Sequence, residues 1–459
     1  MSIGDIHKEL DLQEHFSPEY LNNLVVSDSY TKLVEKLGNN ACSLLLLNCD
    51  KGMEVGIDKM SYKIGPNFQG IKNIPPGVHF IYYSIMGCVP STPEHDFDNS
   101  IQGFFVNFAP GEVIIRHWSP QNRRFEKLDA LEDAYISAVR RGEFFVSLAP
   151  YLLELYGKWN ELVNFITPEI LAKLTPATED IRPFNEDTKI GQISLQDLIL
   201  KRNIDNISMG DDQVLNLKYI KSDISTLEKC KEVTSDVLDP SSTLVVDKSA
   251  NFNDCLDMNA GSGTIYYSTI PSINSLPKKL GLVHTEYIAT LSYDPSPILE
   301  YMISLEYEGN LMLILGEIQF TFIIFMYCSC ISAYEQYSKL IELLSNCESI
   351  VIKYPDLYVN FLKIICCHLR IMPDDILSNP ISQISIDIQV LVNLYKITQV
   401  DIDQMKLQNL EISKLQKLKT LLKYSNQMNE LVKFKFFIDI DTLELISEDA
   451  PIVVSLPIS

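Results

Sequence analysis

Basic residues are scarce in this chain of 459 residues, because 38 Lys and Arg stand against 60 Asp and Glu, giving a formal charge of −22. Most of such a surface would repel a phosphate backbone, which argues against direct nucleic-acid binding. The chain also lacks an apolar run near its start, since charged residues are scattered through positions 1–16. No secretion signal is therefore expected, and the cytoplasm and nucleus are the predicted locations.

The ten cysteines lack the spacing of a disulfide framework or a metal site. In a reducing compartment they are expected to remain free thiols. The nearest approach to a metal cluster is Cys366-Cys367-His368, which lies within an apolar helical pattern. Neighbouring residues of a helix point about 100° apart, so these side chains do not converge on one ion. They are predicted to belong to a helical core.

The common catalytic and cofactor motifs are also missing. No G-x-S-x-G, H-E-x-x-H or G-x-G-x-x-G occurs, and the seven histidines show no ligand spacing on one helix face. Residues 65–72 have the glycine spacing of a phosphate loop, but Ile71 stands where the loop requires Lys. We therefore expect no cofactor, no metal and no enzymatic activity. The alternative that stays open is an intracellular hydrolase whose catalytic residues are dispersed in the sequence.

What the chain does contain is ample apolar and aromatic bulk, with 46% hydrophobic residues, 22 Tyr and 20 Phe. A helical pattern covers residues 17–36. Runs of β-branched and aromatic residues between Gly, Pro and Asn clusters then predict strands at residues 43–48, 78–85, 103–108 and 112–118. Both faces of the last strand are largely apolar, which indicates a sandwich or barrel covered on each side. Helical spacing returns over residues 127–141 and 144–165.

The second half of the chain has a helical pattern throughout. Its predicted helices span residues 297–307, 310–330, 333–347, 355–371, 381–397 and 410–434. Before them, residues 175–263 carry 16 acids and 9 bases with few apolar residues. This composition predicts a partly disordered linker or insertion, and a third domain is the weaker alternative.

The predicted fold class is α+β, with a β-rich, sandwich-like or barrel-like domain followed by an all-α domain. Five parts are expected along the chain. They are an N-terminal helical extension (1–40), the β-rich domain with trailing helices (41–174), the acidic linker or insertion (175–263), the helical domain (264–435) and a C-terminal tail with a short strand (436–459).

The most apolar stretch, residues 310–331, approaches the ~20 residues that a membrane span requires. Glu317 and Gln319 argue against a span, because a carboxylate at its centre costs ~2.5 to 3.5 kcal/mol on insertion scales. A helix at the centre of a bundle is predicted instead. If Glu317 is buried there, we expect a backbone amide or hydroxyl donor to satisfy it, because Lys and Arg are sparse in the flanking helices.

Several short motifs recur in an order that is specific to one family. They are Gly56-Ile57-Asp58, Tyr62, Gly65-Pro66, Phe68, Gly70-Ile71-Lys72, Ile74-Pro75-Pro76-Gly77, His79-Phe80, Tyr83-Ser84, Gly103-Phe104-Phe105, Trp118, Lys158-Trp159, Asn164-Phe165-Ile166, Leu315-Gly316-Glu317-Ile318-Gln319-Phe320 and residues 451–457. The pattern closely resembles the Aar-two family, the A1 cistron-splicing factors. The resemblance covers roughly residues 40–170 and 265–459, and it does not extend to the N-terminal extension or the linker.

The resemblance implies a non-enzymatic assembly factor of the spliceosome, needed for pre-mRNA splicing. Family members look like a β-rich domain followed by a VHS-like helical domain. They bind the RNase H-like and Jab1/MPN-like domains of Prp-eight, the scaffold of the U5 small nuclear ribonucleoprotein, and so keep away the helicase Brr-two and RNA. The chain is expected to be a monomer on its own, without a direct nucleic-acid or membrane partner.

Partner binding is predicted for the C-terminal strand, whose residues are Ile452, Val453, Val454, Ser455 and Leu456. A five-residue strand needs an edge to pair with, and the resemblance implies that Prp-eight supplies it. The alternative is that the tail covers an edge of its own β domain. The remaining signature residues are predicted to be structural. They are Gly56, Asp58, Gly65, Pro66, Gly70, Pro75, Pro76, Gly77, His79, Trp118, Trp159, Gly316, Glu317 and Gln319.

Overall fold

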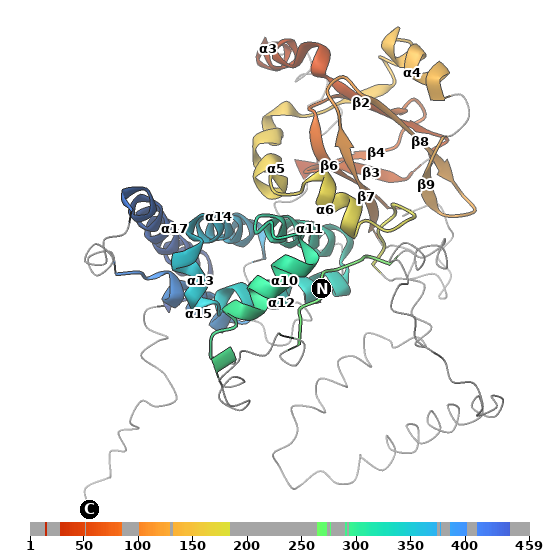
Figure 1. Cartoon of the computed structure of the whole chain (residues 1–459). Coiled ribbons are helices and arrows are strands. Elements are labelled where there is room, and N and C mark those ends of the chain that lie inside the picture. The colour runs from red at the N-terminus through yellow and green to blue at the C-terminus, as the bar shows by residue number, and fades with distance from the viewer. Residues whose placement is uncertain are drawn as a thin grey trace, which may run out of the picture. The chain divides into compact units, whose positions relative to one another are not determined.

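A computed structural model describes residues 14–15, 28–50, 52–84, 101–128, 132–183, 264–272, 276, 290–291, 293–373, 377, 386–401 and 411–440. Within this part of the chain, a β-sheet domain precedes a helical region, as the sequence predicts (Figure 1). A VHS-like arrangement of the helices stays a prediction.

The β domain contains two five-stranded sheets. The first sheet has the order β1 (Glu14–His15), β4 (Met60–Lys63), β3 (Glu54–Ile57), β6 (Gly77–Ser84) and β7 (Ile101–Phe108). The second has the order β10 (Leu148–Pro150), β5 (Gly70–Ile74), β2 (Cys42–Leu47), β8 (Val113–Ser119) and β9 (Arg124–Lys127). The four predicted strands correspond to β2, β6, β7 and β8 within two residues at each end.

The inner faces of the two sheets share one hydrophobic core. Ile81 of β6 and Phe104 of β7 belong to the same buried cluster as Leu44 of β2 and Trp118 of β8. The opposite face of β8 is also covered, because Ile115 packs beneath α4 (Glu132–Arg140). Strand β8 therefore has apolar contacts on both faces, as its sequence predicts.

The helices that trail this domain differ from the prediction. The expected helix over residues 127–141 is the shorter α4, since Lys127 ends strand β9. The expected helix over residues 144–165 is wrong at its start, where a turn leads into β10, which pairs in parallel register with β5. The 3-10 helix η3 (Leu153–Leu155) and the helices α5 (Tyr156–Val163) and α6 (Pro168–Leu174) follow.

Between β1 and β2, helix α3 (Asp28–Leu37) and the 3-10 helix η1 (Gly38–Asn40) fall within or next to the predicted N-terminal helix. Residues 17–27 of that prediction lie outside the described residues. Tyr30 of α3 is buried and donates a hydrogen bond to the carbonyl oxygen of Tyr151 at 3.0 Å. Helix α3 is thereby fixed to the segment between β10 and η3.

The helical region consists of α10 (Ser296–Glu306), α11 (Leu313–Cys328), α12 (Ile331–Ser345), α13 (Glu348–Lys353), α14 (Pro355–Ile371), α15 (Ile388–Thr398) and α17 (Ile412–Phe436). Every residue of α11 from Ile314 to Cys328 is buried. Helix α11 is therefore the central helix that the sequence predicts. None of the described helices is long and apolar enough to span a membrane. Cys366, Cys367 and His368 are core residues of α14, as predicted.

The outer face of the first sheet packs against α11. Phe105 of β7 stacks on Phe320 of α11 with ring centroids 4.8 Å apart. Tyr327, the penultimate residue of α11, contacts the rings of Phe80 and Tyr82 on β6. The β domain and the helical region thus share a continuous core along this helix.

Candidate functional site

Two of the predicted signature residues, Asp58 and His79, meet in a buried polar cluster of the β domain. Asp58 lies in the turn between β3 and β4, and His79 lies on β6. The Nδ1 atom of His79 is 2.6 Å from Oδ2 of Asp58, and its Nε2 is 2.8 Å from the carbonyl oxygen of Pro75. Tyr151 donates to Oδ2 of Asp58 at 2.7 Å, and the backbone amide of Phe80 donates to Oδ1 at 3.0 Å.

This cluster has the composition of an acid–base dyad but not its accessibility. The side chains of His79 and Asp58 are 0% and 1% exposed, and both ring nitrogens already face hydrogen-bond partners. A general base needs a free nitrogen within reach of a substrate proton. The cluster instead joins the β3–β4 turn, strand β6 and Tyr151, which is a structural task.

The turn that leads into β6 depends on Gly77. Its φ is +126°, a conformation that side chains with a Cβ rarely adopt. Pro75 and Pro76 precede it between β5 and β6, where the chain bends at Pro76. Gly56 and Gly70 are buried on β3 and β5, whereas Gly65 and Pro66 are exposed between β4 and β5.

The two tryptophans are buried anchors with satisfied indole nitrogens. Trp118 of β8 donates to Oδ2 of Asp50 at 2.8 Å. Trp159 of α5 donates to the carbonyl oxygen of Val78 at 2.8 Å. Each indole thus ties its strand or helix to another part of the β domain.

A second polar cluster surrounds Glu317, which is completely buried on α11. The backbone amide and the hydroxyl of Ser268 donate to its two carboxylate oxygens at 3.0 and 2.6 Å. Tyr307 and Gln336 donate at 2.7 and 2.9 Å. Within the part of the chain that the structure describes, no Lys or Arg pairs with Glu317. The expected backbone and hydroxyl donors are confirmed.

Lys173 of α6 extends the Glu317 cluster toward the β domain. Its Nζ donates to the Ser268 hydroxyl at 2.7 Å and to the Glu306 carboxylate at 2.8 Å. Ser268 belongs to the extended segment 264–272, which has no helix or strand of its own. The cluster therefore fastens this segment between α6, α10 and α11.

Gly316 and Gln319, the neighbours of Glu317 in the signature, attach α11 to the turn between α5 and α6. The side-chain oxygen of Gln319 accepts from the backbone amide of Phe165 at 2.8 Å, and its Nε2 donates to the carbonyl oxygen of Glu161 at 3.1 Å. A Cβ added to Gly316 would lie 2.3 Å from the carbonyl oxygen of Phe165. Only glycine permits this close approach.

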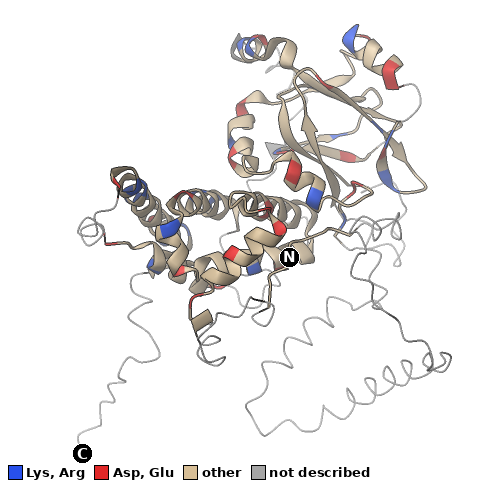
Figure 2. Ribbon diagram, viewed as in Figure 1, with Lys and Arg blue, Asp and Glu red and all other residues tan. Residues whose placement is uncertain are grey.

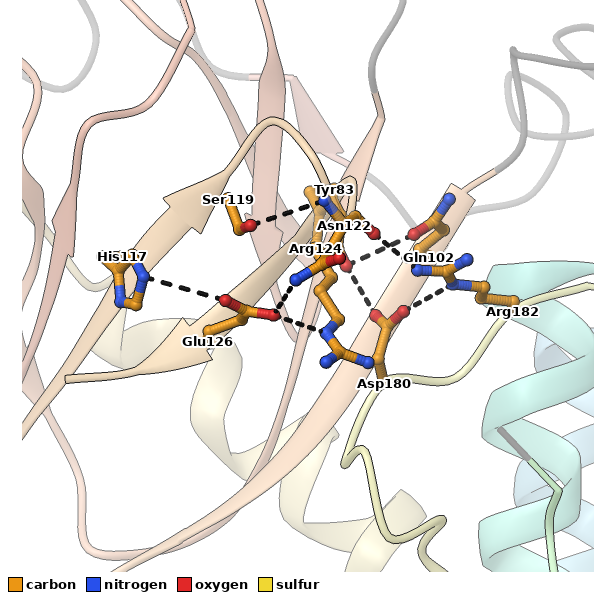
Figure 3. Close-up of polar contacts among 9 residues, drawn as sticks. All are labelled: Tyr83, Gln102, His117, Ser119, Asn122, Arg124, Glu126, Asp180 and Arg182. Atoms are coloured by element: carbon orange, nitrogen blue, oxygen red, sulfur yellow. Dashed lines mark hydrogen bonds and ion pairs between the residues drawn. The ribbon is translucent and has the colours of Figure 1, made fainter. Parts of the chain in front are cut away.

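A third polar network lies at the edge of the β domain (Figure 3). Asp180 accepts from the Tyr83 hydroxyl at 2.5 Å and from Nε of Arg182 at 2.7 Å. Burial raises the pKa of the Asp180 carboxyl, although these two hydrogen bonds lower it. Arg182 also donates to the carbonyl oxygen of Asn122, next to strand β9.

The segment that carries Asp180 also pairs with the free edge of β7. The backbone groups of Ile181 and Gly103 exchange two hydrogen bonds of 2.7 and 3.0 Å. These residues fall within the predicted linker, residues 175–263, whereas Ile181 is 0% exposed. Residues 180–182 thus hold the chain on the sheet just before residues 184–263, which lie outside the described residues.

The sequence identified Asp58 and Glu317 but not Asp180, and it missed most of the partners of these acids. The recognised motifs do not include Tyr151, Ser268 or Gln336. These residues are distant in sequence from Asp58 and Glu317, so no residue spacing indicated that they would meet. The predicted partner-binding strand, residues 452–456, lies outside the described residues. Among those that are described, no group of three His, Cys, Asp or Glu side chains could hold a metal ion.

Comparison with known proteins finds two family models that match this chain. Residues 40–176 match the family model of the AAR2 N-terminal domain, and residues 267–441 match that of the AAR2 C-terminal repeat region. Protein AAR2 homolog of Mus musculus is 28% identical over 355 residues, which are 77% of this chain and 81% of the relative.

The homologues of Homo sapiens and Caenorhabditis elegans are 26% and 25% identical over 356 and 354 residues. These alignments cover 77% of this chain and 81% and 85% of the relatives. The two matched regions contain both polar clusters built around Asp58 and Glu317. The chain therefore belongs to the AAR2 family.

Proposed function

We propose that this protein is a non-enzymatic assembly factor for the U5 small nuclear ribonucleoprotein, required for pre-mRNA splicing. It binds Prp-eight through the RNase H-like and Jab1/MPN-like domains and blocks premature binding of the helicase and RNA. Membership of the AAR2 family is the observation that carries this proposal. In this proposal the protein acts in the cytoplasm and nucleus.

The buried clusters support a scaffolding role over a catalytic one. Asp58, His79 and Glu317 are the signature residues with acid–base chemistry, and all three are enclosed and hydrogen-bonded to protein groups. Groups used in this way stabilise a fold and are poorly placed to contact a substrate. The function is then carried by surfaces that dock a partner.

The docking element that we propose is the C-terminal strand, residues 452–456. Main-chain hydrogen bonds of an added strand contribute about 0.5 to 1.5 kcal/mol each, and alternate side chains supply specificity. Ile452, Val454 and Leu456 would lie on one side of such a strand. Val453 and Ser455 would lie on the other.

The test is a calorimetric titration of the full chain with a recombinant Prp-eight fragment that contains both domains. The triple variant Ile452→Asp, Val454→Asp and Leu456→Asp should weaken binding at least tenfold, about 1.4 kcal/mol. The control Val453→Asp with Ser455→Asp should weaken it less. Absence of binding by the unchanged chain would contradict the proposed partner, and equal losses in both variants would contradict the docking strand.

A further inference from the structure

Helix α17 is basic on an otherwise acidic molecule. It contains six lysines and one acid, Glu430, which is a net charge of 6 − 1 = +5, whereas the whole chain has −22. Lys and Arg can be followed along this helix in Figure 2. The helix therefore attracts negatively charged groups that the rest of the surface repels.

An open groove of about 690 Å³ lies at the C-terminal end of α17. It is lined by Arg370, Glu430, Leu431, Lys433, Phe434, Lys435 and Phe437. The side chains of Phe434 and Phe437 are 83% and 90% exposed, an unusual state for two neighbouring aromatic rings. The groove thus combines an apolar surface with a cationic rim.

The cations of this rim are held in place by local contacts. Lys433 pairs with Asp439 at 2.8 Å, and Lys435 donates to the carbonyl oxygens of Arg370 and Met372 at 2.9 and 2.6 Å. Arg370 is exposed in the last turn of α14, and no described carboxylate forms an ion pair with it. A carboxylate that docks here would meet an available guanidinium group.

The chain itself leaves the described structure beside this groove. Phe437 adopts a left-handed conformation that ends α17, and the chain then passes through the fully buried Ile440. Residues 441–459 follow directly. They contain Asp441, Glu444, Glu448 and Asp449, no Lys or Arg, and then the apolar run from Pro451 to Ile458. Nineteen residues can reach about 60 Å when extended, far more than a return to the groove requires.

We infer that in the free protein the groove binds the chain's own C-terminal segment, residues 441–459. The acidic part of the segment faces Arg370 and Lys433, and the apolar part covers Phe434 and Phe437. Covalent attachment gives the segment an effective concentration near the millimolar range, so weak contacts are enough to keep it bound. The inference concerns the free protein and does not rest on the proposed function. If both hold, the groove and the partner compete for one segment.

Hydrogen exchange of the free, full-length protein tests this inference. Amides of residues 449, 450 and 452–456 should exchange at least about tenfold more slowly than in an unstructured chain. The variant Arg370→Glu with Lys433→Glu should abolish that protection. Lys419→Glu with Lys423→Glu is the matched control, since both lysines are exposed on the same helix and lie outside the groove. It should keep the protection.

A charge exchange makes the test specific. Adding Glu448→Lys and Asp449→Lys to the groove variant should restore the slow exchange, because the ion pairs are re-formed with opposite signs. Phe434→Ala should also reduce protection without changing any charge. Fast exchange in the unchanged chain, equal effects of groove and control variants, or failure of the charge exchange would overturn the inference. Protection that rises with protein concentration would overturn it as well, in favour of a second copy.

Discussion

At the scale of single residues, several buried side chains keep a polar group in an apolar environment. His368 of α14 is fully buried and stacks on Phe322 with ring centroids 3.6 Å apart. Its Nδ1 lies 3.1 Å from the Tyr337 hydroxyl, whereas its Nε2 has no hydrogen-bond partner. Such a site accepts the neutral imidazole far better than the charged one.

This burial predicts a loss of stability in acid. Desolvation holds the pKa of His368 well below its ordinary value of 6.5 in the folded chain. Below about pH 6.5 the unfolded chain takes up a proton that the folded chain does not, so the free energy of unfolding falls by about 1.4 kcal/mol per pH unit. Above that pH the imidazole is neutral in both the folded and the unfolded chain, so His368 no longer lowers the free energy of unfolding.

Denaturant unfolding between pH 7.5 and 5 measures the effect. His368→Phe keeps the stacked ring and should flatten this part of the pH profile, whatever its stability at pH 7.5. Tyr337→Phe removes the hydroxyl but leaves the imidazole, so it should retain the slope. An unchanged slope in His368→Phe would mean that other groups dominate the acid response.

At the scale of elements, α11 has buried residues on every side, so its sequence shows little amphipathic pattern. Its position is set instead by Gly316, Glu317 and Gln319. Glu317 accepts four hydrogen bonds from Ser268, Tyr307 and Gln336. Because all four come from residues outside α11 and the carboxylate is acceptor-only, the helix has one favourable rotation.

Replacing this carboxylate by an amide tests the role of the cluster. In Glu317→Gln one acceptor oxygen becomes an NH2 group that faces existing donors, which should cost about 2 to 4 kcal/mol. Glu335→Gln is the control, because Glu335 is exposed on α12 and should stay within about 0.5 kcal/mol of the unchanged chain. Equilibrium unfolding measures both. If Glu317→Gln left the free energy of unfolding unchanged, the acid would not be needed as a hydrogen-bond acceptor.

The helices and strands also show which parts of the fold could be predicted from the sequence alone. Helix α14 was predicted to the residue, because its apolar spacing and Pro355 are local signals. The short strands β3, β4, β5, β9 and β10 were not predicted, since three to five residues carry little periodicity and their partners are distant. The acid of the α11 cluster was predicted with its donor type, but Ser268 and Gln336 could not be named before the fold placed them nearby.

At the scale of the whole molecule, one buried cluster continues from the outer face of the first sheet to α17. It contains Phe80 of β6, Trp159 of α5, Phe320 of α11 and Phe436 of α17. A β domain and a helical region that share such a core should unfold together, since neither keeps a complete core without the other. Helix α11 contacts the α5–α6 turn directly, so a change at this contact should reduce the cooperativity of unfolding.

Gly316→Ala tests that contact. The new Cβ would stand 2.3 Å from the carbonyl oxygen of Phe165, a backbone atom, so α11 must move away from the turn. The expected cost is about 1 to 3 kcal/mol, as for other overpacked sites. Differential scanning calorimetry should show one transition for the unchanged chain and a lower, broader or divided transition for the variant.

The matched control for this variant is Gly157→Ala. Gly157 lies on helix α5 and has no atom within 4 Å of an added Cβ, so alanine should be neutral or raise stability by up to about 1 kcal/mol through its helix propensity. Hydrogen exchange locates the change: in Gly316→Ala, amides of both β7 and α11 should exchange faster, because Phe105 and Phe320 lose their stacked contact. If only α11 responded, the sheet would be stable without the helix, and the shared core would not couple the two parts of the molecule.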